Sequence, residues 1–230
     1  MAMEIIYEDN HIIAVNKACG EIVMSDRTGD TPLTEPVKSY LREKYQKPGN
    51  IFLGLPHRID RPTSGVVLLA RTGKMLTRLN ALFKEKEGMR KTYWAVVDQV
   101  PQPEKGTLIH YMSRNRERNK STAHIKVVPD SKLASLSYSV LAQLDRYALL
   151  EVELHTGRHH QIRAQLAKIG VHIKGDLKYG FPRSNSDGGI HLHARRIEFI
   201  HPVKLEPVSI TAPLPNEPVW NLFSSQLQLK

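Results

Sequence analysis

Apolar and polar residues alternate along much of this chain, and the spacing predicts more strands than helices. Over residues 135–140 the alternation is complete, as in a sheet with one buried face. Residues 66–70 form a continuous apolar run, which is typical of a fully buried strand. Strands are therefore expected at 4–7 and 12–15, paired as a hairpin, and at 66–70, 93–98, 124–128, 136–141, 150–154, 197–200 and 208–212.

Three segments have the apolar spacing of helices, and these stripes indicate core packing. The first covers residues 31–45 and opens with a Thr-Pro pair, which suits an N-cap and a first helical residue. The second covers residues 74–87 and is followed by Gly88. The third follows Thr156, a candidate cap, and ends before Gly170. Residues 183–189 (RSNSDGG) predict an exposed loop.

The order of these elements predicts the fold class. Strands outnumber helices and do not alternate regularly with them, which argues against a doubly wound parallel sheet. No internal repeat and no linker is visible in the 230 residues. We therefore expect one α+β domain over residues 1–230, with a mixed, largely antiparallel sheet flanked by helices.

The stretch His57-Arg58-Ile59-Asp60-Arg61-Pro62-Thr63-Ser64-Gly65 holds the strongest candidate for chemistry. It places one carboxylate between Arg58 and Arg61, in a turn that leads into the apolar run 66–70. Flanking arginines favour the ionised form of an acid and lower its pKa, which suits a nucleophile or a base. Equally, Asp60 could cap a turn or form a structural salt bridge.

The charge of the chain points to a polyanionic partner. Its formal net charge is +10 and its pI is about 9.7, values that favour binding to phosphates, although a merely basic enzyme could share them. Residues 110–126 carry five Lys or Arg against one Glu, without an apolar stripe. We expect there a solvated, mobile basic loop that binds a phosphate backbone through Arg114, Arg116, Arg118 and Lys120.

Other classes of protein fit this sequence poorly. No apolar run approaches the roughly 20 residues that span a bilayer, and no secretory signal is visible at the start. Cys19 is the only cysteine, so an intrachain disulfide is excluded and a cytoplasmic location is expected. No P-loop glycine spacing and no HExxH or CxxC pattern occurs. Two groups of histidines could in principle bind zinc, namely His155, His159 and His160 in one and His191 and His193 in the other. Because no cluster of acidic ligands accompanies them, no metal is expected.

The stretch around Asp60 also resembles the catalytic motif of the RluA-type pseudouridine synthases, an HRLD-type sequence followed by Arg, a variable residue and TSG. Further family segments occur in the family's order and cover most of the chain. They are KTYWAVV from Lys91, LHTGRHHQIR from Leu154, GDLKYG from Gly175, LHA from Leu192, HP at His201 and APLP from Ala212.

This resemblance implies an RNA-modifying isomerase that breaks the glycosidic bond of a uridine, turns the base and rejoins it through carbon, without a cofactor. The target would lie in ribosomal or transfer RNA. The family fold is a single catalytic domain in two halves with a cleft between them. Some relatives carry an N-terminal RNA-binding domain, for which this chain leaves no room. No obligate protein partner is implied. The sequence leaves the oligomeric state open, and a monomer is one of the states that fit it.

The resemblance also assigns roles to single residues. Asp60 matches the catalytic aspartate, Arg163 its arginine partner, and Tyr93 a tyrosine that stacks on the target uracil. Arg58 matches an arginine that fills the space left by the flipped base, or else contacts phosphate. Arg61 and Arg158 are expected to contact the RNA backbone.

The chain departs from the family pattern in three places, which concern subgroup and substrate more than activity. Ala18 follows the Asn-Lys pair where proline is usual. Gln165 stands where the family's RxHL segment has histidine, and Val171 precedes His172 where a GHP-like sequence is common. Two other functions remain open. One is a catalytically silent RNA-binding or ribosome-assembly protein on the same fold, and the other is a metal-dependent hydrolase that uses the histidines.

Overall fold

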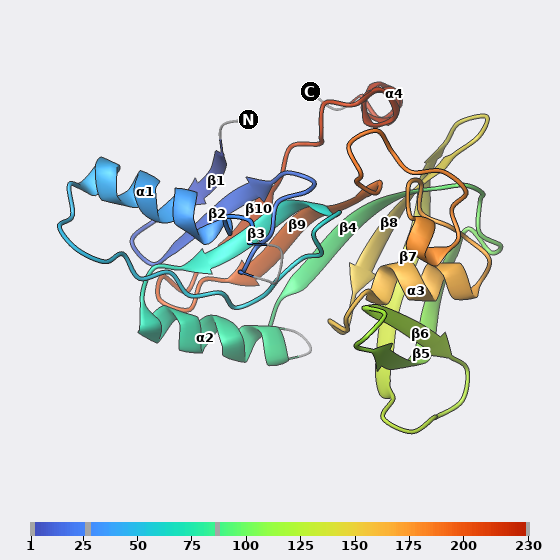
Figure 1. Cartoon of the computed structure of the whole chain (residues 1–230), viewed down its shortest axis with the longest axis horizontal. Helices are drawn as coiled ribbons and strands as arrows, with labels where there is room; N and C mark the ends of the chain where they lie inside the picture. Colours follow the sequence, from blue (N-terminus) through green and yellow to red (C-terminus); the bar gives the residue numbers. More distant parts are fainter. Residues whose placement is uncertain (1–2, 26–28, 86–87, 229–230) are drawn as a thin grey trace. The chain divides into compact units, whose positions relative to one another are not determined.

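The computed structural model describes residues 3–25, 29–85 and 88–228. The chain forms two compact units, and each unit combines stretches that are far apart in sequence (Figure 1). Unit 1 contains Met1–Arg90 and Ala194–Pro213, and unit 2 contains Lys91–His193 and Leu214–Lys230. No helix in the described ranges combines the length and the apolar character needed to cross a membrane.

Unit 1, as far as its residues are described, is a small sheet with two helices. Its strands follow the order β1-β2-β3-β9, β10 pairs with β9, and the pairs β1–β2, β2–β3 and β9–β10 are antiparallel. The bounds are β1 Glu4–Glu8, β2 Ile12–Lys17, β3 Ser64–Ala70, β9 Leu192–Ile200, β10 Pro207–Thr211, α1 Thr34–Tyr45 and α2 Gly73–Lys84.

The apolar run of β3 is buried at every residue because β2 flanks it on one side and β9 on the other. On one face Val66 and Leu68 join a core cluster with Met75 and Leu79 of α2. Thr72 caps α2, since its side chain accepts a hydrogen bond from the Met75 N–H at 3.1 Å. Strand β3 therefore provides a rigid support for the loop that precedes it.

Asp9 ties the β1–β2 turn to the segment after β9. Its carboxylate accepts hydrogen bonds from the His11 and Ile12 N–H groups at 2.7 and 2.8 Å. It also lies 3.0 Å from Lys204 Nζ and 3.2 Å from Nε2 of the buried His201. Burial alone would raise the pKa of Asp9, but the hydrogen bonds from Ile12 and His11 and the Lys204 ammonium outweigh it and lower the pKa to about 2.

The depressed pKa of Asp9 predicts a specific pH dependence of stability. A carboxyl whose folded pKa is below its unfolded value stabilises the fold above the unfolded value, and this contribution is lost as the pH falls toward the folded value. We expect Asp9→Asn to lower the free energy of unfolding at neutral pH by about 2 kcal/mol. Urea denaturation between about pH 7 and pH 2 should show that the difference in free energy of unfolding between Asp9→Asn and the wild type decreases as the pH falls. A difference that stays constant with pH would contradict this prediction. Asp145→Asn, at an exposed turn residue, is the control.

Unit 2 is a five-stranded antiparallel sheet in the order β4-β8-β7-β5-β6. Three helical segments accompany it, two of them α-helices and one a short 3-10 turn. The bounds are β4 Arg90–Val97, β5 Lys105–Asn115, β6 Lys120–His124, β7 Lys132–Gln143, β8 Ala148–Leu154, α3 Gln161–Lys168, η1 Leu177–Tyr179 and α4 Pro218–Gln226.

Successive residues of β4 pack into different clusters, which explains why its second half, residues 93–97, is continuously apolar. Ala95 and Val97 share a cluster with Ile162 and Leu166 of α3. Trp94 and Val96 instead join Trp220 and Phe223 of α4. The sheet is thus covered by α3 on one face and by α4 on the other, and α3 is held firmly enough to carry functional side chains.

The structure confirms the predicted α+β class, the largely antiparallel strands and the opening hairpin. The strands expected at 66–70, 93–98, 136–141, 150–154, 197–200 and 208–212 are present, although β7 and β9 begin four and five residues earlier than predicted. Gly170, with φ +78°, lies just past the end of α3 as expected. Residues 183–189 form the expected loop, mostly exposed and outside helices and strands.

Several boundaries were predicted wrongly. Helix α1 begins at Thr34 rather than at the Thr-Pro pair, because Leu33 N–H is bonded to Ile22 O and holds the preceding segment outside the helix. Helix α2 ends at Lys84, so Gly88 does not follow its end, and the predicted terminus Glu87 lies outside the described residues. His160, not Thr156, is the N-cap of α3.

The largest difference between the sequence prediction and the structure concerns the basic segment. Residues 110–126 do not form an irregular loop, because residues 110–124 belong to β5, a four-residue turn and β6. The strand expected at 124–128 is therefore wrong: β6 ends at His124, and the apolar Ile125 and Val127 that suggested the strand are largely exposed. We call residues 110–124 the basic hairpin.

Candidate active site

Asp60 lies in unit 1, in the short loop that leads into β3. Its side chain is neither fully buried nor fully exposed, while the preceding Ile59 is buried and anchors the loop. The Thr63 N–H donates to the backbone oxygen of Asp60 at 3.0 Å and closes a turn there. The sequence prediction that this acid lies at the start of a buried strand is confirmed.

The side chain of Lys17 supports this loop, a role that the sequence analysis did not predict. The side chain is fully buried, and Nζ donates to the carbonyl oxygens of Ala18 and Glu21, both at 2.8 Å, and of Arg61 at 3.1 Å. The Gly20 N–H also donates to Arg61 O at 3.0 Å. Burial lowers the pKa of Lys17 to about 8, an effect that the nearby Cys19, Glu21 and Asp60 oppose. Lys17 therefore fixes the backbone next to Asp60.

Removing this ammonium group is expected to loosen the loop. Lys17→Met leaves three carbonyl oxygens without their donor, so we expect a loss of about 3 kcal/mol in the free energy of unfolding. Hydrogen exchange of the Gly20 and Thr63 amides should become faster than in the wild type. Lys84→Met, at an exposed position in the last turn of α2, is the control. Unchanged exchange at both amides would show that Lys17 does not hold the loop.

Gly65 fixes the distance between β3 and β9. Its φ is +112°, and a Cβ there would collide with the backbone of Ala194. Only glycine allows this approach without strain, so the TSG sequence after Asp60 has a structural reason.

The two arginines that flank Asp60 are exposed. Arg61 Nη2 lies 2.7 Å from Asp30 Oδ2, with both side chains about half exposed. An exposed pair of this kind contributes little stability. Both guanidinium groups are therefore accessible to a ligand that approaches the Asp60 loop.

Arg163 and Tyr93 lie in unit 2. Arg163 is on α3 and is 95% buried, and it makes a bidentate pair with Asp176: Nε lies 2.7 Å from Oδ2 and Nη2 lies 2.8 Å from Oδ1. Its guanidinium carbon lies 4.9 Å from the centre of the Tyr179 ring. Tyr93 is partly buried on β4, faces Val152 of β8 and packs on the same cluster as α3.

Sequence reasoning assigned no role to Asp176 or Tyr179, although both belong to the GDLKYG segment that it identified, and it considered His160 only as a zinc ligand. His160 Nδ1 lies 2.9 Å from the Tyr179 hydroxyl, and the backbone of His160 has φ +53°. Burial, followed by the charge of Arg163, lowers the pKa of His160 to about 2. His160 is therefore neutral at physiological pH. The predicted contact of Arg163 with Asp60 stays a prediction.

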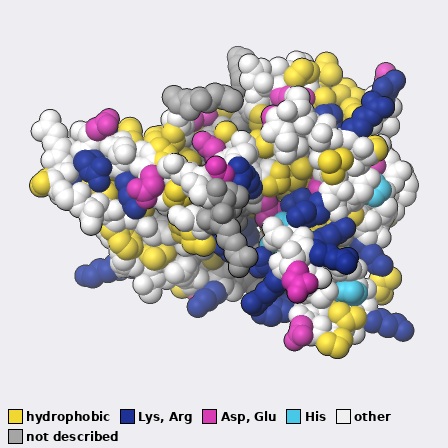
Figure 2. Space-filling model, viewed as in Figure 1, with side chains coloured by type: hydrophobic (Ala, Val, Ile, Leu, Met, Phe, Trp, Pro, Cys, Tyr) yellow, Lys and Arg dark blue, Asp and Glu magenta, His cyan; other side chains and the backbone are white. Residues whose placement is uncertain are grey.

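The basic hairpin presents its charges to solvent. Arg114, Arg116, Arg118 and Lys120 are all exposed, and Figure 2 shows Lys and Arg side chains gathered where β5 and β6 lie in Figure 1. The Asn115 side chain accepts a hydrogen bond from the Arg118 N–H at 2.8 Å and orders the turn. Arg158 is exposed as well, and its Nε donates to Leu133 O at 3.0 Å.

Most of the histidines in the two candidate zinc groups form hydrogen bonds with other side chains. His155 Nε2 lies 2.8 Å from Ser137 Oγ, and His191 Nε2 lies 2.8 Å from Glu217 Oε2. Within residues 3–25, 29–85 and 88–228, no three His, Cys, Asp or Glu residues are grouped so that they could hold a metal ion.

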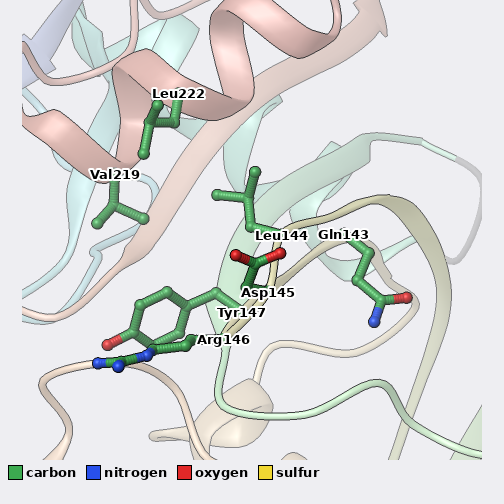
Figure 3. Close-up of a pocket in the computed structure, with 7 residues that line it drawn as sticks. All are labelled: Gln143, Leu144, Asp145, Arg146, Tyr147, Val219 and Leu222. Carbon is green, nitrogen blue, oxygen red and sulfur yellow. The ribbon is translucent and has the colours of Figure 1, made fainter.

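A pocket of about 680 Å³ opens in unit 2 between the β7–β8 turn and α4 (Figure 3). None of the predicted site residues lines it, so the candidate active site lies elsewhere. It is lined by Gln143, Leu144, Asp145, Arg146, Tyr147, Val219 and Leu222.

Comparison with known proteins identifies the family. The model of the RNA pseudouridylate synthase family matches residues 11–168. The chain is 32% identical over 216 residues to ribosomal large subunit pseudouridine synthase C of Vibrio vulnificus, covering 91% of this chain and 65% of that protein. It is 30% identical over 242 residues to tRNA pseudouridine synthase C of Vibrio cholerae, covering 97% of this chain and 95% of that protein.

Structural comparison agrees with this result. The solved structure of human RNA pseudouridylate synthase domain containing 4 matches with a TM-score of 0.80 and 25% identity, covering 99% of this chain and 94% of that one. These matches confirm the resemblance carried by the motifs around Asp60, Tyr93 and Arg163. The chain belongs to the RNA pseudouridylate synthase family, whose members are isomerases.

Proposed function

We propose that this protein converts specific uridines of ribosomal or transfer RNA to pseudouridine in the cytoplasm, with Asp60 as the catalytic carboxylate and no cofactor. In this reaction the bond between C1′ and N1 breaks and a bond between C1′ and C5 forms. The proton on C5 is lost and N1 gains one, so the product is an isomer of the substrate. No oxidant or group donor is needed.

The observation that carries the proposal is the way in which the loop that bears Asp60 is held in place. Its loop is anchored by β3, by the buried Ile59 and by the three carbonyl contacts of Lys17. A carboxylate held on a rigid backbone, yet not sealed in the core, suits a nucleophile or a base. Arg163, fixed by Asp176, would keep the carboxylate ionised during the reaction, and Tyr93 would stack on the uracil.

RNA binding is assigned to the exposed basic side chains. A uridine within a helix must leave the stack before C1′ is accessible, and a guanidinium plane can stack in the vacated space. We assign this role to Arg58. Arg61, Arg158 and the basic hairpin would contact phosphates, which gives binding a steep dependence on salt.

The test uses ribosomal and transfer RNA from cells that lack the gene for this protein. Incubation with the purified protein, followed by carbodiimide tagging and sequencing, should reveal pseudouridine at one or a few positions that are unmodified in the starting RNA. The same positions should carry pseudouridine in cells that have the gene. Salt-sensitive binding without any new pseudouridine would instead favour a catalytically silent RNA-binding protein.

A further inference from the structure

Tyr179 lies where three parts of unit 2 meet: the basic hairpin, the start of α3 and the Arg163 guanidinium. Its hydroxyl is 2.8 Å from the Ser121 backbone nitrogen on β6 and 2.9 Å from His160 Nδ1. Its ring lies 4.9 Å from Arg163 Cζ and 5.2 Å from Lys120 Nζ, measured to the ring centre. One side chain, 93% buried, therefore contacts both a predicted phosphate-binding element and the predicted catalytic arginine.

One hydrogen bond of the hydroxyl has a direction that its partner fixes. The backbone N–H of Ser121 can only donate, so the hydroxyl oxygen accepts this bond. The hydroxyl proton is then available for Nδ1 of His160, which is neutral at physiological pH and has an acceptor nitrogen. Since His160 is the N-cap residue of α3, this pair of bonds joins β6 to the helix that carries Arg163.

A second set of contacts ties the turn of the hairpin to the same place. Asn119 Oδ1 lies 3.1 Å from His159 Nε2, and Lys178 Nζ donates to Asn119 O at 3.1 Å. The Ser121 hydroxyl lies 2.8 Å from His159 Nδ1. The rings of His159 and His160 stack with their centres 3.7 Å apart. Several polar contacts thus attach the hairpin to α3 and η1, so the position of the hairpin affects the positions of these two helices.

Arg163 is held at this junction from two sides. Asp176 fixes two of its nitrogens, and its guanidinium carbon lies over the Tyr179 ring. A small displacement of Tyr179 would therefore change the direction in which the guanidinium points. Displacements of about 1 Å in a catalytic group can lower a rate by about 100-fold.

We infer that Tyr179 is a positioning residue that couples phosphate binding at the basic hairpin to the orientation of Arg163. RNA bound across Arg116, Arg118 and Lys120 holds the hairpin, the Ser121–Tyr179–His160 hydrogen bonds transmit that restraint to α3, and Arg163 is fixed for reaction. This inference rests on the proposed function.

The test is a double-mutant cycle on an RNA transcript that contains the target uridine mapped with the wild-type protein. Tyr179→Phe removes the hydroxyl but keeps the ring beside Arg163. Arg116→Gln with Arg118→Gln weakens phosphate binding at the turn. The single-turnover rate is measured at saturating RNA, and the dissociation constant is measured separately. Tyr138→Phe is the matched control, because Tyr138 is a buried tyrosine of the same unit whose hydroxyl donates to Pro103 O at 3.0 Å.

Coupling predicts a distinct pattern of rates. Tyr179→Phe should lower the single-turnover rate about 10-fold with little change in RNA affinity, while Tyr138→Phe leaves the rate unchanged. The hairpin substitutions should weaken affinity and also lower the rate at saturation in the wild-type background. In the Tyr179→Phe background they should weaken affinity alone.

Two results would overturn the inference. One is a wild-type rate for Tyr179→Phe, or a loss no larger than that of Tyr138→Phe. The other is a hairpin effect on the saturated rate that is equal in both backgrounds, which would show that the two sites act independently. If the wild-type protein forms no pseudouridine in any RNA, the proposed function fails instead, so the two failures are distinguishable.

Discussion

Asp60→Asn is expected to abolish pseudouridine formation, lowering the rate by at least about 1,000-fold. Asparagine has nearly the same shape as aspartate but is neutral and has a much weaker nucleophile in its side chain. Two contacts that hold the loop use its backbone carbonyl oxygens, since Thr63 N–H donates to Asp60 O and Lys17 Nζ donates to Arg61 O. The substitution should therefore remove the reactive group and leave the fold in place.

This prediction can be checked by comparing turnover, RNA affinity and unfolding in one set of samples. Asp60→Asn should bind RNA with an affinity close to that of the wild type and unfold at a similar urea concentration. Asp30→Asn, which removes a neighbouring carboxylate from the exposed pair with Arg61, should keep activity within about twofold, because exposed ion pairs contribute little. Turnover by Asp60→Asn at the wild-type rate would refute the role assigned to the aspartate.

The pair between Arg163 and Asp176 supports the second large effect. Both side chains are at least 95% buried, so removing one partner leaves an uncompensated charge in the interior. We expect Asp176→Asn and Arg163→Met each to lower the free energy of unfolding by about 3 kcal/mol and pseudouridine formation by at least about 100-fold.

A double substitution separates stability from catalysis. Arg163→Met combined with Asp176→Leu replaces the buried pair by apolar side chains, an exchange that is often neutral for stability. Its free energy of unfolding should return to within about 1 kcal/mol of the wild type. Its activity should remain as low as that of Arg163→Met. Recovery of activity together with stability would show that the pair is structural only and that Arg163 has no role in the reaction.

The sequence predicts best the elements whose residues alternate strongly or are continuously apolar. Strand β3 is an example, and it places Asp60 correctly because a short apolar run that follows turn residues is typical of a buried strand. Strand β6 shows where this reasoning fails. Its buried positions are Ser121 and Ala123, which are small and carry little hydrophobic signal, so the hairpin looks like a polar loop. Because Ile125 and Val127 are apolar, the strand was predicted at 124–128, although both side chains are exposed and lie outside β6.

The supports of the candidate site could not be predicted from spacing for a different reason. A lysine is normally exposed, and nothing in the residues around Lys17 indicates that three carbonyl oxygens surround its ammonium group. Asp176 follows Arg163 by 13 residues, across the end of α3 and a turn, so their pairing depends on tertiary structure. The resemblance to the family identified the segments that contain these residues but gave no role to Lys17, Asp176 or Tyr179.

The division of the chain has a consequence for biosynthesis. Strand β9 passes from one unit to the other between His193 and Ala194, and the final segment supplies α4 to unit 2. When the ribosome has made the first 190 residues, each unit still lacks an element that covers or extends its sheet. Neither unit can therefore reach its final packing until the last part of the chain emerges, and the nascent protein must keep β3 and β4 from aggregating in the meantime.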